Sequence, residues 1–179
     1  MSRLALAFWL IFAAGMAVYP VIVAWSLPTI SAAAGGLTPF DLRPSGYSYQ
    51  EARAFLAALT PEGVDFYRTV QHRLDIVYPP LIAASLFLGI ALLAPPAFGR
   101  LRWLLAAVAL PIMVFDWLEN IAVGGLLALG PAGITPEEVA AASRWTVLKS
   151  GFSTVAMLVL LALLILWTWR RFRPSVGGA

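Results

Sequence analysis

Ionisable side chains interrupt an apolar stretch of the chain at residues 115–120, which read FDWLEN. Asp116 and Glu119 are three residues apart, and Asn120 is four residues beyond Asp116, so a helix would carry all three on one face. A charged side chain at the centre of a bilayer costs about 2.5–3.5 kcal/mol even on a lenient insertion scale. These side chains must therefore find partners, become protonated or face water.

The single lysine of the chain offers such a partner. At 1.5 Å per residue, Lys149 lies about 9 Å inside its own apolar run, in the outer half of the expected bundle. Arg144 and Asp75 fall in the same half. We therefore predict one polar zone that is reached from outside the cytoplasm, in which Lys149 forms an ion pair with Asp116 or Glu119.

Three interpretations of this polar zone are open at the level of sequence. In the first, the ion pair is structural and fixes the register of two helices, because buried pairs add specificity more than stability. In the second, Glu119 or Asp116 acts as a general acid or base on a lipid-soluble substrate, with Lys149 as its electrostatic partner. In the third, the zone is a path for protons or a small solute, a common role of acids inside membranes.

The residue types exclude several kinds of cofactor site. Cysteine is absent and His72 is the single histidine, so iron–sulfur, haem-thioether and zinc sites lack ligands. The pair Asp116 and Glu119 is similar to half of the acidic magnesium site of membrane prenyltransferases, but the chain has no second such cluster. We therefore predict neither a metal nor another cofactor.

The composition is that of a membrane protein. Hydrophobic residues make up 61% of the 179 residues and charged residues 12%, against about 25% charged in soluble domains. Apolar runs cover residues 4–27, 74–94, 103–129 and 143–169, and each reaches the roughly 20 residues that cross a bilayer. The first run exceeds the apolar core of a secretory signal peptide, so we expect an uncleaved helix. The sequence predicts an all-α fold, an integral-membrane four-helix up-and-down bundle that forms one domain over residues 1–179.

The basic residues predict the orientation of this bundle. They lie at the ends of apolar runs and form no patch, which argues against a nucleic-acid partner. The arginines concerned are Arg3, Arg100, Arg102, Arg170, Arg171 and Arg173. Because cytoplasmic loops are enriched in Lys and Arg, both termini are expected in the cytoplasm. In a bacterial host the chain would then span the inner membrane, with residues 28–72 outside the cytoplasm.

Residues 28–72 predict a small helical cap outside the membrane. Residues 28–40 read as a loop because they are rich in Pro, Gly and small side chains. Ser48 and Glu51 have the spacing of a capping box, so an amphipathic helix should begin at Tyr49. Thr60 before Pro61 predicts another helix start. The cap either packs on the mouth of the bundle or serves as a lid or docking surface within a larger membrane complex.

The chain resembles a family of small four-span bacterial inner-membrane proteins that has no assigned activity. The resemblance rests on a Gly-Tyr-Ser then Glu-Ala signature after the first span and on an Asp followed by Tyr-Pro in the second. The matching positions are Gly46, Tyr47, Ser48, Glu51, Ala52, Gly63, Tyr67, Asp75, Tyr78 and Pro79. It implies the fold and the topology only. A weaker similarity links Asp116, Trp117 and Glu119 to the acids and tryptophan of membrane sterol isomerases, whose first-span and loop patterns this chain lacks.

These observations predict a polytopic inner-membrane protein with a buried polar cavity. Its expected partners are the lipid bilayer and a lipid or quinone-like ligand, which it would bind in an accessory role. The alternatives are the enzyme and the proton or solute pathway described above. The residues expected to line the binding site are Asp75, Tyr78, Asp116, Glu119, Asn120, Arg144 and Lys149.

Overall fold

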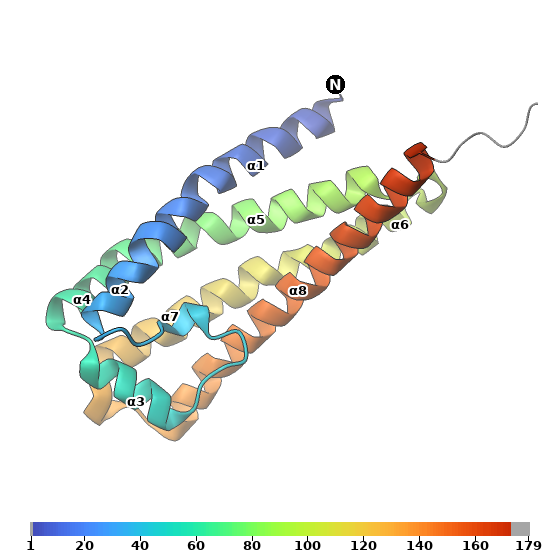
Figure 1. Ribbon diagram of the computed structural model, residues 1–179. Coiled ribbons are helices and arrows are strands. Elements are labelled where there is room, and N and C mark those ends of the chain that lie inside the picture. The colour runs from blue at the N-terminus through green and yellow to red at the C-terminus, as the bar shows by residue number, and fades with distance from the viewer. Residues whose placement is uncertain (1, 173–179) are drawn as a thin grey trace, which may run out of the picture.

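The computed structural model describes residues 2–172, which contain helices and no strand. Four long helices are apolar enough to cross a membrane: Arg3–Ala33, Pro61–Leu93, Leu101–Gly133 and Pro136–Phe172. They run up and down along one another, which confirms the predicted all-α bundle (Figure 1). The chain therefore has the architecture of a multi-pass membrane protein.

The first long helix corrects one prediction. It consists of α1 (Arg3–Val21), a π-turn (Ile22–Ser26) and α2 (Leu27–Ala33), so residues 28–33 are helical and not a loop. In the π-turn the Leu27 N–H donates to the carbonyl of Ile22, five residues back, and this wider turn precedes Pro28, which has no N–H to donate. Fully buried Ile30 then anchors the added turn against the cap.

The second and fourth long helices begin well before the predicted spans, while the third exceeds its predicted span by a few residues at each end. The second is α4 (Pro61–Phe66), a π-turn (Tyr67–Gln71) and α5 (His72–Leu93). The third is α6 (Leu101–Ala106), a 3-10 turn (Ala107–Ala109) and α7 (Leu110–Gly133), and the fourth is α8 (Pro136–Phe172). At 31 to 37 residues each is longer than the roughly 20 residues a bilayer needs, so each must tilt or project beyond it.

The cap begins with a 3-10 turn (Phe40–Leu42) and contains α3 (Tyr49–Ala58), which starts at the predicted residue. Ser48 and Glu51 form the full capping box, and the hydrogen bonds from Ser48 hold the pKa of the Glu51 carboxyl below its usual value. In Figure 1, α3 lies across the ends of α7 and α8, away from Arg3 and Phe172. The termini of the described chain thus share one end of the bundle. Arg173 of the predicted basic tail lies outside the described residues.

An apolar core joins the cap to the projecting helix ends. It is built around rings of the cap and around aliphatic side chains of α7 and α8; its members include Phe40, Phe55, Tyr67, Val123, Leu126, Leu127 and Val139. Part of the predicted span 103–129 therefore packs in the cap and not between the other spans.

The Gly-Tyr-Ser signature has a structural explanation in this core. Gly46 has φ +84°, and a Cβ there would lie 2.5 Å from Ser143 Oγ on α8. The next N–H, of Tyr47, donates to the same Ser143 Oγ at 2.8 Å, while the Tyr47 ring packs on Phe40. Burial raises the pKa of Tyr47. The signature seats the cap on α8.

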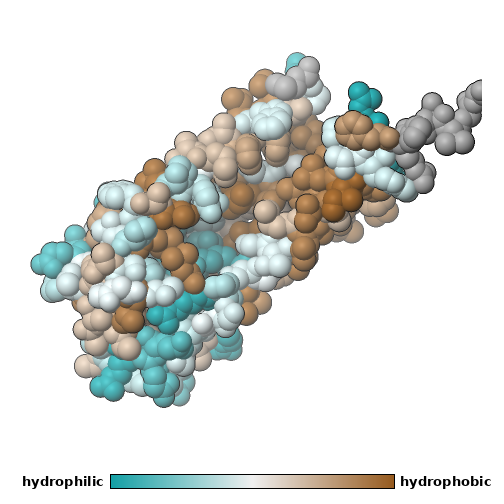
Figure 2. All heavy atoms as spheres, in the orientation of Figure 1, coloured by the Kyte–Doolittle hydropathy of each residue, from teal (hydrophilic) through white to brown (hydrophobic). Residues whose placement is uncertain are grey.

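The four long helices do not close into a symmetric bundle. α1 packs along α5, α7 packs along α8, and α5 contacts both α7 and α8. In Figure 1, α1 and α8 run apart from each other, with α5 seen between them. Figure 2 shows the resulting hollow, with hydrophilic atoms in its depth near the cap and hydrophobic atoms towards the termini. This hollow holds the candidate site.

Candidate functional site

An ion-pair cluster joins α7 to α8. Lys149 Nζ lies 3.5 Å from Asp116 Oδ2 and forms a second ion pair with Glu119 Oε2. Glu119 is 1% exposed, and its other oxygen accepts a hydrogen bond from Thr146 Oγ1 at 2.5 Å. Both oxygens of Glu119 are thus occupied by α8. Asp116 has one described partner, Lys149, and lines the adjoining cavity.

The packing of α7 on α8 explains why these side chains meet. Lys149 and Thr146 are three residues apart and share one face of α8. Beside them Phe115 of α7 stacks on Trp145, with ring centroids 5.8 Å apart, and contacts Phe152 at 5.4 Å. These rings hold the two helices in register, so that the ammonium lies between the two carboxylates.

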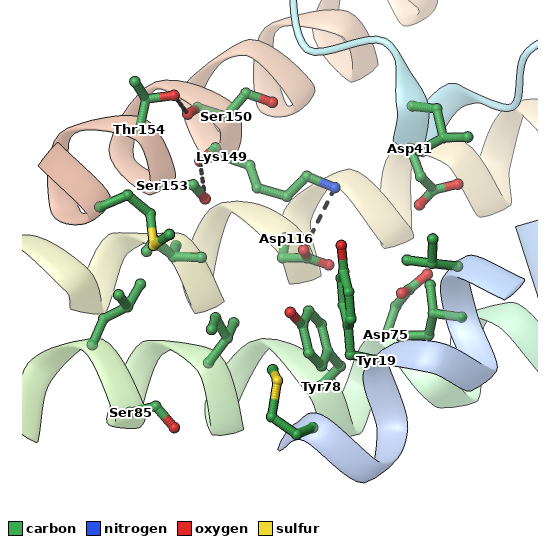
Figure 3. A pocket seen from close by; sticks show the side chains of 18 of the residues that line it. Tyr19, Asp41, Asp75, Tyr78, Ser85, Asp116, Lys149, Ser150, Ser153 and Thr154 are labelled. Carbon is green, nitrogen blue, oxygen red and sulfur yellow. Dashed lines mark hydrogen bonds and ion pairs between the residues drawn. The ribbon is translucent and has the colours of Figure 1, made fainter. Parts of the chain in front are cut away.

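A cavity of about 670 Å³ adjoins this cluster and is lined by α1, α5, α7, α8 and the 3-10 turn of the cap. Its charged side chains and its tyrosines gather near the cap, as Figure 3 shows for Tyr19, Asp41, Asp75, Tyr78, Asp116 and Lys149. Towards the termini the lining is uncharged and mainly apolar. Besides the hydroxyl residues Ser85, Ser153 and Thr154, it includes Phe8, Phe12, Met16, Leu86, Met157 and Leu160. The cavity therefore has a polar end and an apolar end along the axis of the bundle.

Asp75 is held at the polar end by a chain of buried amide and hydroxyl groups. Gln71 Nε2 donates to both carboxylate oxygens of Asp75, at 3.0 and 2.8 Å. Gln71 Oε1 accepts from Ser26 Oγ at 2.6 Å, and both Ser26 and Gln71 are fully buried. Ser26 belongs to the π-turn of the first long helix and Gln71 to the π-turn of the second. The hydrogen bond between them therefore joins the two π-turns next to the carboxylate of Asp75.

Two tyrosines and an aspartate of the cap complete the polar end. Tyr19 of α1 and Tyr78 of α5 lie with ring centroids 5.8 Å apart, and Figure 3 shows Tyr19 pointing towards the ion pair. Asp41 lies in the cap's 3-10 turn and accepts a hydrogen bond from the hydroxyl of Tyr67. The cap thus contributes a carboxylate to the cavity.

Two residues predicted for this zone lie elsewhere. Asn120 lines a separate hollow between α5 and α7 with His72, and Arg144 is exposed and donates to the Ala140 carbonyl of its own helix at 3.3 Å. Successive helical residues are about 100° apart, so Asn120 points well away from Glu119, and Arg144 lies about 140° round α8 from Lys149. Both residues lie at the predicted depth along their helices, but their side chains point in other directions around the helix axis.

Sequence reasoning missed several residues of the site. A signal existed for Gln71, which is four residues before Asp75, a spacing at which Gln and Asp side chains bond on a helix. Thr146 is three residues before Lys149 and could have been found in the same way. Asp41 comes from a turn far away in the chain, and no pattern around it indicates a site.

The site offers charged groups and hydrogen-bonding groups. Among residues 2–172, no three His, Cys, Asp or Glu side chains are close enough together to hold a metal ion. What the arrangement provides is carboxylate acceptors, tyrosine hydroxyls and one ammonium at the end of an apolar cavity. Such a surface can bind the head group of an amphiphile and can exchange a proton with it.

In comparisons with known proteins, no family model, curated protein or solved structure matches the chain.

Proposed function

We propose that the protein is a bacterial inner-membrane protein that binds a lipid-soluble amphiphile between α1 and α8. One observation carries this proposal, namely a cavity of about 670 Å³ whose polar end lies at the cap and whose apolar end lies between apolar helices. The volume falls within the range of about 300–1,000 Å³ that is typical of small-molecule sites.

The route into the cavity supports a ligand from the membrane over one from water. The lining includes Phe8 and Phe12 of α1 and Met157 and Leu160 of α8, the two helices that lie apart in Figure 1. A molecule in the bilayer can enter between them without crossing the cap. An apolar chain then replaces lipid along these side chains while its head group reaches Asp116 and Lys149.

The positive-inside rule supports an orientation in which the head group lies in the outer leaflet. Arg3, Arg100 and Arg170 lie towards the end of the helices opposite the cap, and the positive-inside rule puts that end in the cytoplasm. The polar end of the cavity, next to the cap, then faces away from the cytoplasm. A ligand with its head group there has the orientation of an outer-leaflet lipid.

Native mass spectrometry of the purified protein tests the proposal. We expect a co-purified lipid or quinone-like molecule on the wild-type chain. Ser153 lines the cavity, so Ser153→Phe should fill part of it and remove the bound mass. Val155 on the same helix is 48% exposed and faces away from the cavity, so the matched variant Val155→Phe should retain it. An apo wild-type spectrum, or equal loss from both variants, would contradict the proposal.

Acid–base chemistry on the same ligand is the second candidate function. It is favoured by the position of Asp116, which lines the cavity, whereas Glu119 is enclosed by Thr146 and Lys149. The same experiment separates the two functions. An enzyme would hold a product on the wild type and a substrate of different mass on Asp116→Asn, whereas a binding protein would hold the same molecule on both.

A further inference from the structure

Acidic side chains outnumber basic ones at the polar end of the cavity. Asp41, Asp75 and Asp116 line it, and the cation that lines it with them is Lys149. No arginine or histidine is part of the lining formed by residues 2–172. Arg43, two residues after Asp41 in the cap, donates to the Thr38 carbonyl and pairs with Glu51 outside the cavity.

The ammonium of Lys149 is already engaged. It forms ion pairs with Asp116 and with Glu119, and Glu119 is fixed by its hydrogen bond from Thr146. An ammonium has three N–H donors, so two carboxylate partners leave at most one for a ligand. The two adjacent carboxylates also cancel its charge as seen from the cavity. Lys149 is therefore a poor site for an anion.

The carboxylates retain free acceptor positions. A carboxylate has about four lone-pair sites. Asp75 uses two for Gln71, Asp41 uses one for Tyr67, and Asp116 uses one for Lys149. The two hydrogen bonds from Gln71 fix the orientation of the Asp75 carboxyl group. The polar end thus presents carboxylate oxygens that can accept further hydrogen bonds from a ligand.

From this geometry we infer that the cavity selects an amphiphile whose head group bears an ammonium, with a hydroxyl as the next best group, and rejects a phosphate or carboxylate head. The inference rests on the proposed function and names the ligand class of the same site. An ammonium is attracted by the three aspartates and donates to their free lone pairs. A phosphate would meet like charges at close range, which is a strong source of discrimination between ligands.

Three photoreactive probes test this inference. Each has the same alkyl chain with a diazirine, and they differ only in a primary ammonium, hydroxyl or phosphate head group. The protein is labelled in nanodiscs of zwitterionic lipid over a range of probe mole fractions. Peptide mass spectrometry then measures labelling of the cavity segments of α1 and α8. We expect half-maximal labelling by the ammonium probe at a mole fraction about tenfold or more below that of the phosphate probe, with the hydroxyl probe between them.

Charge-neutralising variants show whether the aspartates cause this order. In the double variant Asp75→Asn and Asp116→Asn, the ratio of phosphate to ammonium half-maximal mole fractions should fall towards one. Asp116→Asn alone should lower it in part and leaves the Gln71 contacts of Asp75 intact, should the double variant fail to fold. Asp65 is exposed on α4 outside the cavity, so Asp65→Asn removes the same charge and should leave the ratio unchanged.

The outcomes separate this inference from the proposed function. Equal labelling of the cavity by all three probes would leave the binding function standing and overturn the head-group selection. Tighter labelling by the phosphate probe, or an order that survives in the double variant, would overturn it as well. Absence of labelling in the cavity by any probe would contradict the binding function itself.

Discussion

Glu119 and Asp116 differ in what surrounds them, although one lysine contacts both. Glu119 is 1% exposed and lies between Lys149 and Thr146, so both partners of its carboxylate are side chains of α8. Asp116 adjoins the cavity, where a ligand or water can replace a lost partner. The pair on Glu119 therefore lies inside the packed interface of α7 and α8, while the pair on Asp116 faces the cavity.

This difference predicts the effect of removing the lysine. Lys149→Met leaves Glu119 buried without its cation, which costs about 3–5 kcal/mol for pairs of this kind. Thermal unfolding in detergent should show a large drop in Tm. Adding Glu119→Leu removes the stranded charge, so the double variant should recover most of the loss. A double variant no more stable than Lys149→Met would contradict a structural role for the pair.

The sequence predicts how deep a polar side chain lies along its helix, but not the direction in which it points around the helix. Charge and depth sufficed to bring Asp75, Asp116, Glu119 and Lys149 to one zone, because each polar group in an apolar helix needs a partner at its own level. Direction around a helix depends on how the helices are rotated, which the packing of all four decides. Asn120 and Arg144 were misplaced for that reason.

At the level of elements, the prolines of α5 explain an unusual contact of α7. Pro80 has no N–H, so the carbonyl of Ile76 lacks its usual helical donor four residues on. The indole N–H of Trp117 donates to that carbonyl at 3.4 Å. The tryptophan next to Asp116 thus satisfies a backbone group that the proline leaves free, and this accounts for its place beside the acids without a catalytic role.

This interpretation predicts an interaction between two substitutions. Trp117→Phe should destabilise the protein by about 0.5–1.5 kcal/mol, the usual value of a hydrogen bond, because the Ile76 carbonyl loses its donor. In a Pro80→Ala background the restored N–H supplies that donor, so Trp117→Phe should cost clearly less. The comparison is made from Tm values in detergent as a double-mutant cycle. Trp9→Phe, on the exposed face of α1, is the control and should cost the same in both backgrounds.

Element boundaries were predictable where local rules act alone. The starts of α3 and α4 follow from Ser48 with Glu51 and from Thr60, whose side chains cap the first turn. The helical residues 28–33 were missed because Pro28 normally indicates a break, and only a π-turn ahead of it makes room. A π-turn arises from packing between helices, and no short sequence pattern announces it.

The whole molecule has its basic ends on one side and its cap on the other, which predicts a single topology. The chain has no cysteine, so single cysteines report position cleanly. Glu62 is exposed in α4 beside the cap, and Ala97 is exposed in the turn between α5 and α6. In intact spheroplasts a membrane-impermeant maleimide should label Glu62→Cys and not Ala97→Cys, which should react only after the membrane is opened. The opposite pattern would reverse the orientation and place the cavity's polar end in the inner leaflet.

Because the cavity lies between α1 and α8, a ligand would compete with membrane lipids for it. Since it opens sideways, the cavity exchanges with the surrounding lipids, and its occupancy follows the ligand's share of the leaflet instead of its concentration in water. A ligand present as about one lipid in a thousand fills half of the cavities only if it outbinds bulk lipid by about 10³, or roughly 4 kcal/mol. The shared alkyl chain cannot provide this preference. Under the proposed function, the aspartates that line the cavity would have to supply it, and membrane composition would then decide what fraction of the protein carries a ligand.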